Sequence, residues 1–152
     1  MKELKITPIS NGTAIDHIEA GMAMKVARIL QIPDAETHST VSIAMYVKSK
    51  KMGYKDILKI EDRRLKKEEV NKISLISPNA SIVIIKDQEV LEKYNVSLPK
   101  VIRGIAKCSN PNCITNRGEP IETEFQVTNG KDIKLRCLYC DRNITDILAS
   151  IV

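Results

Sequence analysis

All four cysteines of the chain lie in one stretch, as Cys108-x4-Cys113 and Cys137-x2-Cys140 with twenty-three residues between the pairs. Each pair can supply two thiolates to one ion, and the long intervening segment can fold one pair onto the other. Two thiolates from each pair complete the tetrahedral sulfur shell that Zn²⁺ prefers. The spacing therefore predicts one structural zinc ion per chain, bound by these four residues.

Other roles for the cysteines stay open at this point. Disulfides would need an oxidising compartment, but the chain begins Met-Lys-Glu-Leu-Lys and shows no apolar signal segment. A redox Cys-x-x-Cys needs only one pair, and a catalytic zinc keeps one position for water, which a fourth cysteine would close. We favour the structural zinc over disulfides or a redox role.

The segment between the two cysteine pairs has the pattern of a β-hairpin. Residues 123–127 and 133–135 alternate apolar and polar side chains around Asn129-Gly130, a pair typical of a type I′ turn. This hairpin would bring Cys137 back beside Cys113. Because a segment of about fifty residues seldom folds on packing alone, metal binding should supply much of its folding free energy.

The first part of the chain alternates between strand and helix patterns. We expect extended segments at 4–9, 14–18, 40–48, 55–61 and 81–86, and helices at 20–31 and 65–76. The 40–48 strand has apolar residues at every second position and is predicted to be central. The segment 88–94 is short and mixed, and no element is assigned to it.

The order strand, helix, strand, strand, helix, strand is that of a ferredoxin-like split βαβ sandwich, an α+β fold with two helices on one face of an antiparallel sheet. Ser97-Leu98-Pro99 breaks the pattern and marks a domain boundary. We therefore expect a first domain over 1–98 and a small all-β, zinc-ribbon-like domain over 99–152. The apolar tail 144–152 either packs on that second domain or is presented to a partner.

Charge and composition narrow the function. Residues 1–98 carry 16 Lys and Arg against 13 Asp and Glu, and residues 99–152 carry 8 against 6, so neither part is a strongly basic nucleic-acid-binding module. No apolar run approaches the roughly 20 residues of a membrane span. The expectation is a cytoplasmic protein that binds neither membrane nor nucleic acid.

Catalytic motifs are missing from the sequence. It contains no Ser-His-Asp arrangement, no Walker or dinucleotide glycine loop, and only two histidines, His17 and His38. Each histidine alone is more often structural than catalytic. We therefore expect a protein that is not an enzyme.

Lys55 and Lys59 are four residues apart on a predicted strand, so both point to one sheet face with Ile57 between them. Two cations around an apolar centre could hold a phosphate or ribose together with a base. The same pattern also fits a solvated strand face with extended lysines. Asp16 is similarly open, as a ribose contact or a local turn bond.

Several short runs, in their order along the chain, identify a family resemblance. Asp16-His17, the run from Gly53 to Glu61, Ser97-Leu98-Pro99 and the two cysteine pairs together resemble the regulatory subunit of aspartate carbamoyltransferase over about residues 3–150. The resemblance implies a non-catalytic chain of pyrimidine biosynthesis, with an allosteric domain that binds CTP or ATP and a zinc domain that contacts the catalytic chain. It also implies homodimers through the allosteric domain that bridge catalytic trimers in a hetero-oligomer.

Carried over position by position, the resemblance also implies a nucleotide site. The implied residues are Ile6, Ile9, Ala14, Asp16, His17, Lys55, Lys59, Ile85, Val90 and Lys93. Among these, Lys59 and Lys93 would contact the triphosphate and ribose, because a polyanion needs convergent cations. Pro8, Val83 and Gln88 depart from the family pattern, so the resemblance assigns no selectivity between CTP and ATP.

One alternative function follows from the residues around the cysteines. Arg117, Lys131, Lys134, Arg136 and Arg142 would suit a zinc-ribbon nucleic-acid-binding adaptor. Six acidic residues in the same part of the chain oppose it. Phe125 and Tyr139 alone offer stacking platforms there.

Overall fold

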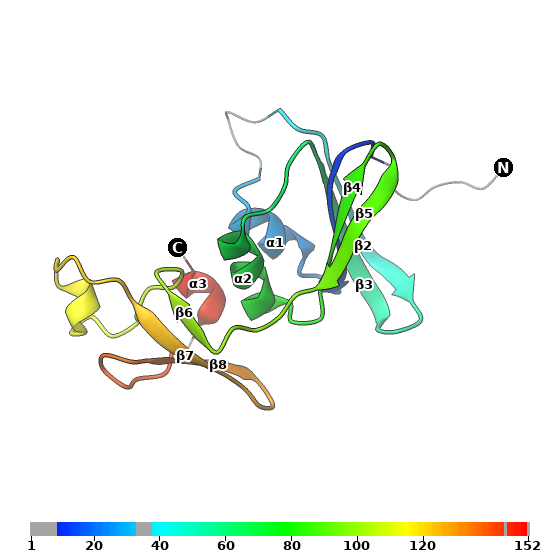
Figure 1. Cartoon of the computed structure of the whole chain (residues 1–152). Coiled ribbons are helices and arrows are strands. Elements are labelled where there is room, and N and C mark those ends of the chain that lie inside the picture. Colours follow the sequence, from blue (N-terminus) through cyan, green and yellow to red (C-terminus); the bar gives the residue numbers. More distant parts are fainter. Residues whose placement is uncertain (1–8, 33–37, 145, 152) are drawn as a thin grey trace. The chain divides into compact units, whose positions relative to one another are not determined.

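A computed structural model describes residues 9–32, 38–144 and 146–151 (Figure 1). The chain divides into two compact units, Met1–Val96 and Ser97–Val152. Among the described residues, no helix is both long and apolar enough to cross a membrane.

The first unit is a five-stranded antiparallel sheet with two helices. Its strands run in the order β2-β3-β1-β4-β5, and β1 is antiparallel to both β3 and β4. The elements are β1 (Gly12–Glu19), α1 (Ala23–Ile29), β2 (Val41–Ser49), β3 (Gly53–Glu61), α2 (Lys67–Ile76), β4 (Ser81–Lys86) and β5 (Glu89–Asn95).

This topology contains two split βαβ units. Strands β1 and β2 are both antiparallel to β3, so they are parallel to each other with β3 between them. In the same way β3 and β4 are parallel with β1 between them. The predicted ferredoxin-like α+β fold is confirmed.

Three details of the first unit differ from the sequence prediction. Strand β2 lies at an edge of the sheet, so its prediction as a central strand is wrong. Strand β5 was not predicted, because all seven of its residues are exposed and it has no buried face to create a pattern. Of the expected strand at 4–9, residues 4–8 lie outside the described part, and Ile9 is not in a strand.

The helices cover one face of the sheet (Figure 1). Cross-strand partners share a face, and Ile15 pairs with Leu58 on one side and Ile82 on the other. These three side chains are at most 1% exposed and pack in the same cluster as Val26 and Ile73 of the helices. Alternation along β1 therefore turns the side chains of Ala14 and Asp16 to the opposite face, which the helices leave open.

Asp56 on β3 is the one ionisable side chain in this core among the described residues, and it is 0% exposed. Its carboxylate accepts hydrogen bonds from the main-chain N–H groups of Gly21 (2.8 Å) and Ala23 (2.9 Å) at the start of α1. It accepts a third from Tyr46 (2.9 Å), in the bulged part of β2. A buried carboxylate at a helix N-terminus thus joins α1, β2 and β3.

Replacing Asp56 should destabilise the first unit. Asp56→Ala leaves three main-chain N–H groups without their acceptor, so we expect the free energy of unfolding to fall by about 3 kcal/mol. Chemical denaturation followed by circular dichroism measures the change. Glu89→Ala removes an exposed carboxylate from β5 and should change stability by less than about 0.5 kcal/mol. Equal stability of Asp56→Ala and the native chain would contradict this role.

The second unit is a three-stranded sheet in the order β6-β7-β8. It is built from β6 (Val101–Arg103), the 3-10 turn η1 (Ile114–Asn116), β7 (Glu124–Asn129), β8 (Ile133–Cys137) and the short helix α3 (Ile147–Ser150). The predicted hairpin is confirmed as β7–β8, and Phe125 pairs with Cys137. Strand β6 was not predicted, since three residues are too few for a pattern.

Two further points of the second unit bear on the sequence prediction. The hairpin closes with Asn129 paired to Ile133, so three residues form its loop, and neither Asn129 nor Gly130 has a positive φ. The predicted type I′ turn is therefore wrong. The tail packs on its own unit, since Ile144 N–H donates to Leu135 and Ala106 bridges to Ile151.

Candidate metal centre and the open sheet face

The four cysteines converge on one point, with their sulfur atoms all within 4.8 Å of one another. The Sγ atoms of Cys108 and Cys140 are 3.7 Å apart, and those of Cys113 and Cys137 are 3.8 Å apart. Four sulfurs bound to one zinc at about 2.3 Å would be separated by about 3.8 Å in a tetrahedron, whereas a disulfide needs about 2.05 Å. The arrangement therefore fits a metal and not disulfides.

Hairpin β7–β8 and the loop after β6 bring the two cysteine pairs together. Cys137 ends β8, and its N–H donates to the carbonyl of Arg142, which folds the second pair into a tight turn. Cys113 precedes η1, and its N–H donates to the carbonyl of Asn110. Three of the four thiols are buried, and Cys140 is partly exposed. All four positions are taken by protein sulfur, so the ion is structural.

The environment of the thiols explains how a metal stabilises this unit. Burial raises the pKa of the Cys108 thiol to about 12. Burial acts in the same direction on Cys140, but hydrogen bonds from Arg142 N–H and the side chain of Asn110 lower its pKa to about 7. Burying uncompensated thiolates is costly, and a bound Zn²⁺ offsets that cost through its charge and its bonds to sulfur.

The polar residues that support the cysteines were not predicted from the sequence. Thr115 Oγ1 donates to Cys113 Sγ at 3.2 Å, and Asn116 Nδ2 donates to the carbonyls of Cys108 (2.9 Å) and Asn110 (2.8 Å). Such groups orient the ligands of a metal. The signal that could have identified them is their position within or just after the Cys-x4-Cys pair.

The open face of the first sheet carries one row of four cross-strand partners. Lys59 of β3 pairs with Ala14 of β1, Ala14 pairs with Val83 of β4, and Val83 pairs with Lys93 of β5. Partners share a face, so two lysines lie at the ends of a small apolar floor. Neither lysine forms an ion pair with any residue that the structure describes.

A bulge in β1 presents Asp16 and His17 beside this row. The register shifts between Ile15 and Ile18, and His17 has a φ of 56°. Asp16 Oδ1 accepts from the His17 N–H at 2.6 Å and lies 2.9 Å from Lys55 Nζ. Ile15 and Ile18 thereby both stay in the core while the residues between them reach the other face.

The two titratable groups of the bulge have shifted pKa values. For Asp16, burial alone would raise the pKa, but the hydrogen bonds and charge of Lys55 and the His17 N–H outweigh it, and the pKa is lowered. For His17, burial lowers the pKa, and Lys55, Lys51 and Lys93 lower it further against the opposing effect of Asp16. Asp16 is therefore ionised at neutral pH, and His17 is neutral.

The other residues that the resemblance implies for the nucleotide site lie only partly beside the lysine row. Ile85 pairs with Val90, two residues along β4 from Val83. Ile9 is 4% exposed, so its side chain belongs to the core and only its main chain could meet a ligand. Ile6 lies outside the described residues.

Neighbours of the bulge that the sequence did not single out are Ser81 and Asn95. His17 Nδ1 is 3.2 Å from Ser81 Oγ, which donates to Asn95 Oδ1 at 3.0 Å. This chain of contacts orients the imidazole from β4 and β5. Only the strand register brings the residues together, so no local sequence signal could have found them.

The two units define a protein class, in which a split βαβ domain precedes a four-cysteine metal domain. Two family models match the chain in the same order. The aspartate carbamoyltransferase regulatory chain allosteric domain matches residues 4–97, and the metal binding domain of the same chain matches residues 100–148. Together they cover almost the whole sequence.

Curated relatives agree with the family models. The aspartate carbamoyltransferase regulatory chain of Methanothrix thermoacetophila is 51% identical over 148 residues, covering 97% of this chain and 96% of the relative. That of Pyrococcus abyssi is 49% identical over 153 residues, covering 99% and 100%. The chain belongs to the family of aspartate carbamoyltransferase regulatory chains. It has one structural zinc site, supported by the metal-domain match and by the cysteine cluster.

Removing the metal should unfold the second unit selectively. A zinc chelator removes the ion that joins the two cysteine pairs, in a unit too small to fold on packing alone, so the native structure of this unit should disappear. Amide NMR spectra of the full chain measure this, and elemental analysis should give one zinc per chain beforehand. Signals of Gly12–Asn95 should persist as an internal control. Retention of native signals from Val101–Cys140 after complete zinc removal would contradict the prediction.

Proposed function

We propose that this chain is the non-catalytic regulatory subunit of an aspartate carbamoyltransferase, the transferase of pyrimidine biosynthesis. In this proposal residues 1–98 form an allosteric domain that binds CTP or ATP. Residues 99–152 form the zinc domain, which holds Zn²⁺ through Cys108, Cys113, Cys137 and Cys140 and contacts the catalytic chain. The match to both regulatory-chain domains and the names of the relatives support this assignment.

The observation that carries the nucleotide-binding part is the row Lys59–Ala14–Val83–Lys93. Four neighbouring strands separate the two lysines by roughly 14 Å between their Cα atoms, at about 4.8 Å per strand spacing. Their flexible side chains can reach inward over the apolar floor from both ends. This arrangement suits a ligand with an apolar base and a polyanionic tail.

Roles for the neighbouring residues follow from their contacts. Lys59 and Lys93 supply the charges that a triphosphate and ribose need, and Asp16 can accept from a ribose hydroxyl. Lys55 is already paired with Asp16 at 2.9 Å, so its main role would be to position that carboxylate. Neutral His17 lies among Lys51, Lys55 and Lys93, and a bound polyanion would favour its protonated form.

Regulation would arise from different affinities of the effector for two states of the assembly. An effector shifts such an equilibrium only by the difference in its binding free energy between the states. The allosteric domain would bind the nucleotide and the zinc domain would transmit the bias through its contact with the catalytic chain.

Exposed apolar side chains support the two protein contacts in this proposal. Ile114, Leu138 and Tyr139 lie next to ligand cysteines in the sequence and are 40–45% exposed, which suits docking on a catalytic chain. Met45 and Tyr46 are exposed on β2, an edge strand, which suits a homodimer through the allosteric domain.

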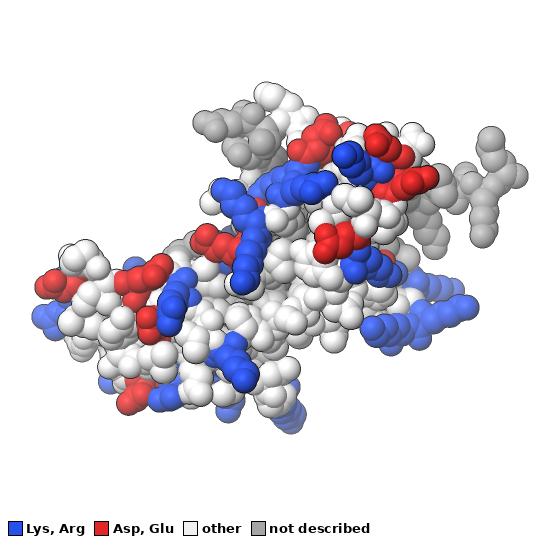
Figure 2. All heavy atoms as spheres, viewed as in Figure 1, with Lys and Arg blue, Asp and Glu red and all other residues white. Residues whose placement is uncertain are grey.

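The nucleic-acid adaptor gains no specific support. Arg136, one of the cations that motivated it, is paired with Asp141 at 2.7 Å. On the face shown in Figure 2, acidic and basic side chains are interspersed over the second unit. A polyanion backbone would meet charges of both signs there.

Removing either lysine of the row should weaken nucleotide binding. Lys59→Ala and Lys93→Ala each remove one charge-assisted hydrogen bond worth about 1.5–3 kcal/mol, so affinity should fall about tenfold to a hundredfold. Calorimetric titration with CTP and ATP measures the decrease. Lys67→Ala is the matched control, because this exposed lysine begins α2, a helix on the other face. Unchanged affinity in both row variants would reject the row as the site.

Zinc removal should also disassemble the enzyme. If the zinc domain is the contact with the catalytic chain, chelation should release catalytic subunits from the regulatory chains. Native mass spectrometry or light scattering of the purified complex, before and after complete chelation, measures the assembly. Readdition of zinc serves as the control for damage by the chelator. A complex of unchanged mass without zinc would contradict the proposed contact.

A further inference from the structure

A second charged feature lies at the end of the first sheet, apart from the lysine row. A cavity of about 220 Å³ opens where β1 begins and where β3 and β4 end. The residues that line it are Asn11, Gly12, Asp62, Arg63, Arg64, Ile85 and Lys86. Three basic residues and one acidic residue are among them.

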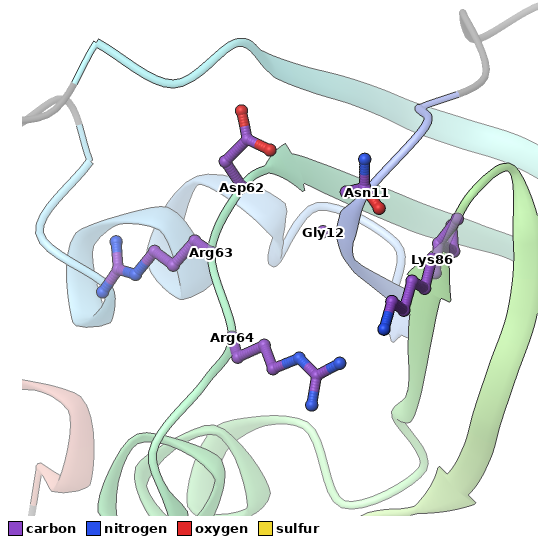
Figure 3. Close-up of a pocket in the computed structure, with 7 residues that line it drawn as sticks. Asn11, Gly12, Asp62, Arg63, Arg64 and Lys86 are labelled. Carbon is purple, nitrogen blue, oxygen red and sulfur yellow. The ribbon is translucent and has the colours of Figure 1, made fainter.

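Two of these cations face the same space. In Figure 3 the guanidinium of Arg64 and the ammonium of Lys86 point toward each other below Gly12. The Asp62 carboxylate points away from that space, as does the Arg63 guanidinium. Neither Arg64 nor Lys86 is ion-paired with a residue in the described part of the chain.

The neighbouring residue, Arg63, has a structural role. Arg63 Nη2 lies 2.6 Å from Glu69 Oε2, and the other oxygen of Glu69 accepts from the Lys66 N–H. Arg63 therefore fastens the loop to the start of α2. Arg64 makes no such contact among the described residues, although it is adjacent in the sequence. Its charge is left available to a ligand.

Three hydrogen bonds hold the main chain from which Arg64 and Lys86 extend. Asn11 Oδ1 accepts from Asp87 N–H at 3.1 Å, and the Asn11 carbonyl accepts from Asp62 N–H at 3.0 Å. Thr13 Oγ1 donates to the Arg63 carbonyl at 2.6 Å. These bonds join the start of β1 to the ends of both neighbouring strands. The main chain of Lys86 and of the loop that carries Arg64 is thus held against the start of β1.

We propose that this cavity binds a phosphate group between Arg64 and Lys86. Two converging cations repel each other, and a dianion between them would turn that repulsion into two charge-assisted contacts. A guanidinium offers a fork of donors to two phosphate oxygens, and an ammonium can take a third. A ligand with a single carboxylate would balance only one of the two positive charges of Arg64 and Lys86.

The size of the cavity narrows the ligand class. Pockets for drug-sized molecules occupy about 300–1,000 Å³, so 220 Å³ suits inorganic phosphate or the phosphate of a small phosphomonoester. A whole nucleotide would extend beyond it. Of the residues that the resemblance implies for the nucleotide site, Ile85 also lines this cavity, but neither Lys59 nor Lys93 does. The cations proposed here are therefore different from those of the nucleotide site.

The test is a phosphate titration of the full zinc-loaded chain, followed by amide NMR at constant ionic strength. Saturable shifts should centre on Gly12, Arg64 and Lys86. In Arg64→Gln/Lys86→Gln the affinity should fall about tenfold or more, because the variant removes both cations that meet the phosphate. The matched control Lys50→Gln/Lys67→Gln removes the same charge from exposed positions outside the cavity and should bind as the native chain does.

Two further experiments distinguish this cavity from the nucleotide site and identify which kind of molecule brings the phosphate. Lys59→Ala/Lys93→Ala should bind phosphate with the native affinity. A lower affinity in this variant, together with native affinity in Arg64→Gln/Lys86→Gln, would overturn the proposal. Shifts spread evenly over surface lysines would also overturn it. Adding CTP to Lys59→Ala/Lys93→Ala tests the source: displacement of phosphate indicates a nucleotide phosphate, and persistence indicates free phosphate or a small phosphomonoester.

Discussion

The antiparallel register of β1 is the constraint on which the first unit depends. This strand pairs with β3 and β4 at once, so its alternation decides which side chains enter the core and which form the open face. Ile15 and Ile18 both reach the core only because a bulge separates them, and the same bulge keeps His17 out of the core beside Asp16. Packing and the proposed nucleotide contacts therefore share one origin.

The second unit depends on a different interaction. Its three short strands enclose a small core around Phe125 and Leu135, and the cysteine cluster ties the hairpin to the loop after β6. Buried thiolates with no ion would be unfavourable, as the raised pKa of Cys108 shows. A bound metal stabilises the thiolates, and its bonds to sulfur join segments that are far apart in the chain. The surface proposed to contact the catalytic chain therefore forms only when this unit folds around its metal.

Much of the fold could be predicted because its signals are local. The stripe of α1, the alternation of β3 and the hairpin β7–β8 are periodic over enough residues to be recognised. Strand β5 could not be recognised, since an exposed edge strand needs no apolar alternation. The edge position of β2 was also hidden, because its apolar alternation fits a central strand equally well. The hairpin turn was mispredicted because Asn-Gly favours a two-residue turn, whereas here three residues form the loop.

The sequence by itself determined the metal site and the family, because ligand spacing and the order of short motifs are read along the chain. It also indicated Lys55 and Lys59 as a pair on one face. Only the tertiary structure decided that Lys55 is held by Asp16, while Lys59 shares a row with Lys93. Likewise, Arg64 and Lys86 meet at one cavity although twenty-one residues separate them in the chain. The physical reason is strand pairing, which brings distant residues together without leaving a local pattern.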